Sequence, residues 1–99
     1  MKPVFWLDEA VKDLSTIGDY IAQESPQAAH RVLLHIKASG DNLSFNPEIG
    51  RAGRVEGTYE LILSDIPYIL PYVVTKDSVQ ILAVLHSSRK WPDSFTKLH

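Results

Sequence analysis

The sequence predicts an α+β fold: an N-terminal strand, then an antiparallel helical hairpin packed on a small antiparallel sheet, in the order β-α-α-β-β-β. Two observations predict it. Apolar side chains recur every three or four residues through two segments of the first half, as in amphipathic helices. The second half holds three runs rich in branched and aromatic side chains, separated by turns of hairpin length. We expect a single domain over residues 1–99.

The first strand is expected in the apolar stretch Pro3–Leu7. Asp8 follows at the position of a helix N-cap, and Glu9 adds negative charge at the positive end of the helix. The first helix should run from about Asp8 to Gln23, because its apolar residues share one face. These residues are Ala10, Leu14, Ile17 and Ile21, flanked by Val11 and Tyr20.

A second helix should begin where Ser25 can act as the N-cap and Pro26 can occupy the first helical position. It should end at Gly40 or at Asn46-Pro47. Because the link between the helices is short, they should form an antiparallel hairpin. The apolar face of this helix comprises Ala29, Val32, Leu33 and Ile36.

Three strands should follow the glycine-rich stretch "NPEIGRAGRVEGTY", which has the composition of a loop. Two short turns, at residues 65–67 and 76–78, make antiparallel pairing of successive strands the natural arrangement. The expected strands are Tyr59–Ser64, Tyr68–Thr75 and Val79–His86.

Composition narrows the possible functions. Ten basic and twelve acidic side chains give a net charge of −2, which creates no general attraction to nucleic acid or anionic membranes. Residues 51–99 carry six of the basic and five of the acidic groups, so an anionic partner would meet this half. The chain has no cysteine, and therefore no disulfide, thiolate nucleophile or cysteine-bound zinc. We find no signal peptide and no membrane span, and expect a cytoplasmic protein.

Most residue patterns that could form a metal, phosphate or catalytic site lack the spacing that such a site needs. His30 and His35 are five residues apart, which turns them about 140° from each other on a helix, so we expect no metal site. No glycine-rich phosphate loop lies between a strand and a helix, and we expect no cofactor. A triad of Ser87 or Ser88 with His86 and Asp93 is disfavoured, because adjacent strand residues point to opposite faces.

Two basic clusters remain, and the ends of the sheet strands could bring them together. Guanidinium groups and an imidazole beside an aromatic ring could bind phosphates and stack a base, or could bind a partner's carboxylates. The alternative is two solvated loops. Separately, Trp91 could pack on the helices as a lid, with Pro92 stopping further strand pairing. The clusters are Arg51 and Arg54 in the glycine-rich loop, and Arg89 and Lys90 beside His86 and Trp91.

The order and spacing of several segments resemble the RelE/ParE superfamily, the toxins of type II toxin–antitoxin systems. These are "DEAVKDLSTIGDYIAQESPQAAHRVLLHI", "NPEIGRAGRVEGTYELIL", "PYILPYVV" and "ILAVLHSSRKWP", and the resemblance covers about residues 3–92. It implies a helical hairpin on a small sheet, and a cognate antitoxin that neutralises the toxin, in a homodimer or an antitoxin-bridged hetero-oligomer. RelE-like members are ribosome-dependent mRNA endonucleases, whereas ParE-like members inhibit DNA gyrase, and such modules serve plasmid stabilisation.

The resemblance is closer to ParE-like chains, as "PVFWL", the "GR.GR" loop and "LH..R.WP" indicate. RelE-type nucleases carry lysines on the strand "YELIL" and an arginine within "PYILPY", where this chain has Glu60, Ile62 and Ile69. These residues cannot stabilise the charge that develops on a scissile phosphate. We therefore expect a gyrase inhibitor without catalysis of its own. The alternative is an mRNA endonuclease that uses His86 as base and Arg89 as phosphate clamp.

Two positions that are commonly arginine in ParE-like chains differ here. Tyr59 stands in "GTYE" where "GTRE" is usual, and Val73 stands in "YVV" where "YRV" is usual. Together with Ile69, these two residues support a third hypothesis, in which the chain is a degenerate toxin that binds only its antitoxin. The residues expected to contact the target or the antitoxin are Arg51, Arg54, Tyr59, His86, Arg89, Lys90 and Trp91.

Overall fold

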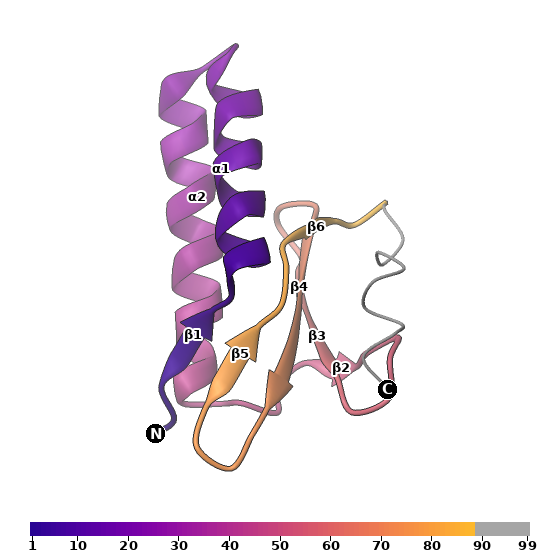
Figure 1. Cartoon of the computed structure of the whole chain (residues 1–99). Helices are drawn as coiled ribbons and strands as arrows, with labels where there is room; N and C mark the ends of the chain where they lie inside the picture. The colour runs from indigo at the N-terminus through magenta and orange to yellow at the C-terminus, as the bar shows by residue number, and fades with distance from the viewer. Residues whose placement is uncertain (89–99) are drawn as a thin grey trace.

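A computed structural model describes residues 1–88, in which two helices pack on one face of a six-stranded mixed sheet (Figure 1). The predicted α+β fold and its order of elements are confirmed, with one short strand added after the helices and the last predicted strand divided in two. The elements are β1 (Val4–Trp6), α1 (Asp8–Ala22), α2 (Pro26–Asp41), the 3-10 helix η1 (Asn42–Ser44), β2 (Arg51–Ala52), β3 (Tyr59–Leu63), β4 (Tyr68–Val74), β5 (Val79–Ile81) and β6 (Leu85–His86).

The helices form the predicted hairpin. α2 begins as expected: the Ser25 hydroxyl accepts a hydrogen bond from the N–H of Ala28 at 3.1 Å, and Pro26 is the first helical residue. The prediction that Asp8 caps α1 was wrong by one position, because Leu7 is the N-cap and no side chain caps this helix. Asp8 instead places its charge in the first turn. Within residues 1–88, no helix has the length and apolar character needed to cross a membrane.

The sheet is mixed, which corrects the prediction of a purely antiparallel sheet. Its order is β1-β5-β4-β3-β2, with β6 also paired to β4, and β1 runs parallel to β5. Two backbone hydrogen bonds extend this parallel pairing, from Val79 N–H to Pro3 O at 2.9 Å and from Leu7 N–H to Ile81 O at 3.0 Å. The parallel direction is possible because α1, α2 and the β3–β4 hairpin lie between the two strands in the chain.

The predicted strand Val79–His86 is divided in two. At Leu82 the backbone N–H donates to the carbonyl of Pro71 at 2.8 Å, and at Val84 it donates to a carboxylate oxygen of Asp13 on α1 at 2.9 Å. The first bond continues the pairing of β5 with β4, whereas the second is made to α1 instead of to β4, and the chain then pairs with the other end of β4 as β6. Strand β6 therefore lies beside the start of β4.

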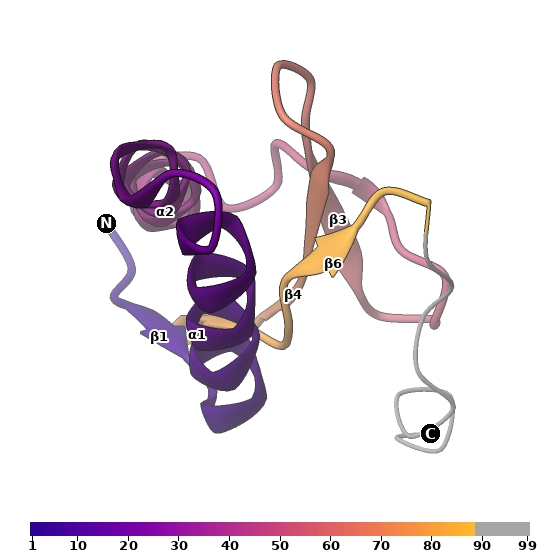
Figure 2. The same ribbon diagram turned by 90° about the horizontal axis from the view of Figure 1, so that it is seen from above.

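Apolar side chains pack on both faces of the sheet. In β4, Leu70 and Tyr72 face the helices and belong to the main core, whereas Val73 faces the other way and packs on a second cluster. Seen from above, both helices lie on one side of the sheet (Figure 2). The second cluster comprises Val55, Leu82, Ala83 and Leu85. The loop after β2 and the segment before β6 thus cover part of the face opposite the helices.

Candidate functional site

The loop arginines lie on the sheet face opposite the helices. Strand β2 pairs antiparallel with β3, which sets Arg51 beside Glu60. Arg51 Nε donates a hydrogen bond to Glu60 Oε1 at 2.9 Å. The Glu60 side chain is only 9% exposed, whereas that of Arg51 is 64% exposed. The carboxylate is thus a fixed part of the sheet surface, and the arginine lies over it at the edge.

Tyr72, in the main core, anchors the chain just before β2. Its ring is fully buried and stacks on Tyr59, with ring centroids 5.3 Å apart, and its hydroxyl accepts a hydrogen bond from the N–H of Gly50 at 2.9 Å. Burial raises the pKa of Tyr72 above its ordinary value, and the hydrogen bond with Gly50 opposes this shift. A Cβ at Gly50 would lie 2.7 Å from the carbonyl of Glu60 and from the Tyr72 hydroxyl, so only glycine fits there.

A second contact closes the loop between β2 and β3. Gly53 N–H donates to the carbonyl of Thr58 at 2.8 Å, and Gly57 has a positive φ of 85°, which favours glycine. Arg54 lies within the closed loop and extends from it over the sheet. The glycines that identified this stretch as a loop therefore fix the positions of its arginines.

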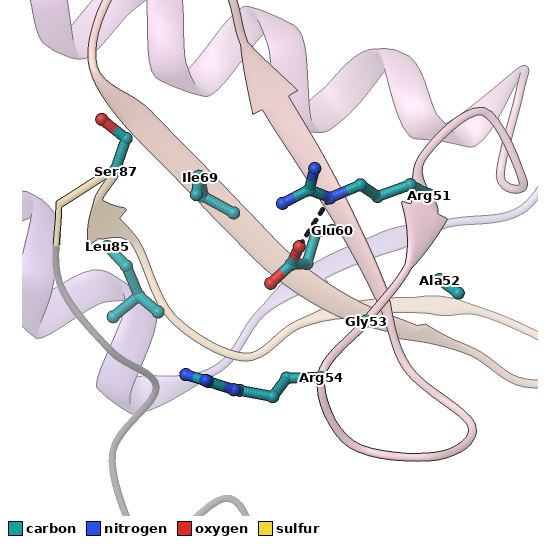
Figure 3. A pocket seen from close by; sticks show the side chains of 8 residues that line it. All are labelled: Arg51, Ala52, Gly53, Arg54, Glu60, Ile69, Leu85 and Ser87. Carbon is teal, nitrogen blue, oxygen red and sulfur yellow. Dashed lines mark hydrogen bonds and ion pairs between the residues drawn. The ribbon is translucent and has the colours of Figure 1, made fainter.

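Both arginines line one pocket of about 390 Å³ (Figure 3). Arg51 and Glu60 lie on one side, and Arg54 reaches from the other side toward Leu85. Ile69 and Leu85 form the apolar part of the wall. The full lining is Arg51, Ala52, Gly53, Arg54, Glu60, Ile69, Leu85 and Ser87.

His86 lies in a different pocket. It pairs with Tyr68 across β4 and β6, and their rings meet edge to face with centroids 5.6 Å apart. Tyr68 packs on the main core, on the helix side of the sheet. The pocket measures about 440 Å³ and is lined by Asp13, Thr16, Ile17, Tyr20, Tyr68, Val84, His86 and Ser88. Because Leu85 and His86 alternate along β6, the imidazole and the two loop arginines line separate pockets.

Ser88 contacts one ring nitrogen of His86. The backbone N–H of Ser88 donates to His86 Nδ1 at 3.3 Å, and the Ser88 hydroxyl lies 2.8 Å from the same nitrogen. Because a backbone N–H can only donate, Nδ1 is the acceptor in the contact with the Ser88 amide. Burial also raises the pKa of Tyr68, which faces the ring, and the nearby Tyr20 raises it further.

The other predicted site residues are dispersed. Tyr59 lies on the helix side of β3, stacked on Tyr72, and not in the pocket with Arg51 and Arg54. Of the departures noted in the sequence, Ile69 lines that pocket and Val73 packs on the second apolar cluster. Arg89, Lys90 and Trp91, and with them the proposed packing of Trp91 and the Asp93 of the disfavoured triad, lie outside the described residues.

Glu60 is the site residue whose role was missed from the sequence. In the sequence, Glu60 stands out only as an acidic residue at a position where RelE-type nucleases carry lysine. Its pairing with Arg51 could not be predicted, because β2 is too short to recognise from its composition. The signal was present in the short hairpin, which brings residues 51 and 60 opposite each other. His35, one of the histidines considered for a metal site, instead pairs with Asp65 at 2.9 Å. Residues 1–88 contain no group of three or more potential metal-ligating side chains.

The sequence is similar to known toxins over most of its length. A family model described as the ParE toxin of the type II toxin–antitoxin system parDE matches residues 4–91. The predicted toxin Y4kP of Sinorhizobium fredii is 44% identical over 91 residues, which are 92% of this chain and 94% of that protein. Toxin RelE2 of Caulobacter vibrioides is 37% identical over 89 residues, 90% of this chain and 99% of that protein.

The same similarity holds in three dimensions. A chain from the solved structure of the chromosomal ParDE toxin–antitoxin system of P. aeruginosa matches with a TM-score of 0.79 at 28% identity. The match covers 87% of this chain and 96% of that chain.

Proposed function

The chain belongs to the ParE toxin family of type II toxin–antitoxin systems, and from this premise we propose that it inhibits DNA gyrase by protein–protein contact and is neutralised by a cognate antitoxin. The observation that carries the proposal is the Arg51–Glu60 ion pair. A carboxylate lies where a RelE-type nuclease would need a cation, and it neutralises the nearest guanidinium.

The apolar neighbours of this ion pair support the same conclusion. Ile62 and Ile69 pair with each other across β3 and β4, on the same face as Glu60. Cleavage of RNA passes through a phosphorane whose extra negative charge must be stabilised by nearby donors or cations. At these three positions the sheet offers a carboxylate and two hydrocarbon side chains, which suit contact with a protein better than with a reacting phosphate.

A ribosome-dependent mRNA endonuclease is the second candidate, because His86 is exposed in a pocket and a relative carries the name Toxin RelE2. The geometry argues against His86 as a general base. Its Nδ1 is already in contact with the backbone N–H and the hydroxyl of Ser88. Arg51 and Arg54 line the other pocket, so neither is placed to clamp a phosphate beside the imidazole.

The test is to induce the chain alone in bacteria and to follow DNA and protein synthesis by pulse-labelling over the first minutes. We expect DNA synthesis to stop first, and the purified protein to block supercoiling by gyrase. Because the proposal gives His86 no catalytic step, His86→Gln should weaken this inhibition at most, as the loss of one contact would, and His30→Gln, the matched change at an exposed histidine of α2, should leave it unchanged.

Two outcomes would contradict the proposal. If protein synthesis stops first and His86→Gln alone restores it, the chain is an mRNA endonuclease. If neither synthesis changes while the protein is present and folded, the chain is a degenerate toxin whose remaining role is to bind its antitoxin. Co-purification of the chain with the product of an adjacent gene would test the antitoxin independently of the target.

A further inference from the structure

The pocket that holds Arg51 and Arg54 has the features of an anion-binding site. The Nε of Arg51 donates to Glu60, and the guanidinium of Arg51 lies next to that carboxylate, on the side of Ile69 (Figure 3). Arg54 forms no ion pair among residues 1–88. Guanidinium groups therefore reach the pocket from two sides, and that of Arg54 is available to a ligand.

The charge of the pocket limits what it can bind. Its described lining contains two guanidinium groups and one carboxylate, which leave a single net positive charge. One monovalent anionic group is balanced by this charge. A nucleic-acid strand carries a charge at every phosphate and gains affinity from rows of cations, whereas the described lining provides two guanidinium groups, one of which already binds the Glu60 carboxylate.

The apolar part of the pocket lining limits which anionic ligands would fit. Ile69 and the buried Leu85 lie beside the charged groups in the same pocket. A ligand that places methylene groups against these side chains and a carboxylate at Arg54 would use both parts of the lining. A glutamate side chain has this composition, while a bare phosphate or an aspartate would leave the hydrocarbon uncovered.

We propose that the pocket of Arg51, Arg54, Ile69 and Leu85 binds a glutamate side chain presented by a partner polypeptide. This rests on the proposed function, in which the chain acts through protein contacts. Arg54 is the principal donor to the ligand carboxylate, Arg51 assists through its terminal nitrogens, and Glu60 fixes the orientation of Arg51.

The test is a titration of the ¹⁵N-labelled chain, followed by NMR at the Nε–H signals of its arginines. The probe is the capped peptide N-acetyl-Leu-Glu-Leu-amide, and the same peptide with glutamine is the comparison. We expect the glutamate peptide to shift the Arg54 signal saturably, and the glutamine peptide to bind about tenfold more weakly, because it lacks a charge-assisted hydrogen bond. Arg54→Gln should weaken binding of the glutamate peptide by a similar factor.

The matched control is Arg31→Gln, which removes an exposed arginine of α2 and should leave the titration unchanged. Equal binding of the two peptides, no binding of either, or full binding by a folded Arg54→Gln variant would overturn the proposal. So would a stronger response to octathymidylate than to the glutamate peptide, which would make the site one for nucleic acid.

The same titration identifies the source of the glutamate. When it is repeated on the chain co-purified with its antitoxin, loss of peptide binding means that the antitoxin supplies the side chain. Retained binding means that the pocket stays open for the target. Because the readout is binding by purified protein, a chain that blocks DNA synthesis but ignores the peptide would refute the pocket and leave the proposed function intact.

Discussion

Tyr72→Phe removes one oxygen atom and tests how the arginine loop is held. The side chain is fully buried, and its hydroxyl accepts the hydrogen bond of Gly50 N–H at 2.9 Å. Phenylalanine keeps the ring, its stacking on Tyr59 and nearly all of its volume. The change therefore isolates the hydrogen bond that anchors the residue before Arg51.

The expected loss of stability follows from what happens to the amide. Leaving a buried donor without its partner costs about 1–3 kcal/mol. Gly50 is only half-buried, so water can replace part of the lost bond, and we expect a loss of about 1 kcal/mol. In a domain of this size, that corresponds to a fall in the melting temperature of about 4–8 °C.

The assay combines urea unfolding with hydrogen exchange at the Gly50 amide. We expect lower stability and much faster exchange at Gly50, with little change at the amides of α2. Tyr20→Phe is the control, because Tyr20 is 74% exposed and the same atom is removed there. Unchanged exchange at Gly50 together with unchanged stability would refute the role given to Tyr72.

Three further predictions concern the fold. Gly40→Ala should destabilise it by about 1–3 kcal/mol in urea unfolding, because the new Cβ would overlap the Trp6 ring; a gain in stability would contradict this. Ser25→Ala should cost about 1 kcal/mol in the same assay, and Ser25→Asp should restore the cap. The hydrogen bond with His35 lowers the pKa of Asp65 below 3.8, so Asp65 stabilises the fold above that pH and loses this effect as the pH falls through its folded pKa. The stabilities of the wild type and Asp65→Asn, measured by urea unfolding, should therefore differ near neutral pH and converge in acid; a constant difference would contradict the pairing.

The helices could be predicted from the sequence because their determinants are local. Three- and four-residue apolar spacing and the Ser25-Pro26 pair place the start of α2 correctly, and its end at Asp41 is one residue after Gly40, the earlier of the two predicted ends. The break after β5 could not be predicted in this way. It depends on a hydrogen bond from Val84 to Asp13, which lies 71 positions away, and no property of the apolar run itself indicates it.

The candidate site was predictable in part for the same reason. Arg51 and Arg54 could be singled out from their glycine-rich surroundings, but Glu60 becomes their neighbour only through the register of β2 with β3. The side of the sheet on which His86 lies depends on the register of β6 with β4, because a shift of one residue would move its side chain to the face that carries the arginines. Which groups share a pocket is decided by strand register, and register was not visible in the composition.

The parallel pairing of β1 and β5 constrains when the protein can fold during its synthesis. Val4 pairs with Val79, 75 positions later, so the strand that leaves the ribosome first waits for almost the whole described chain before it finds its partner. Until then, the apolar side chains of β1 have no sheet to join, and the long-range pairing is among the slowest contacts to form. A nascent or prematurely terminated chain that stops before β5 thus lacks one edge of its sheet, and we expect it to be a substrate for proteases instead of an active toxin.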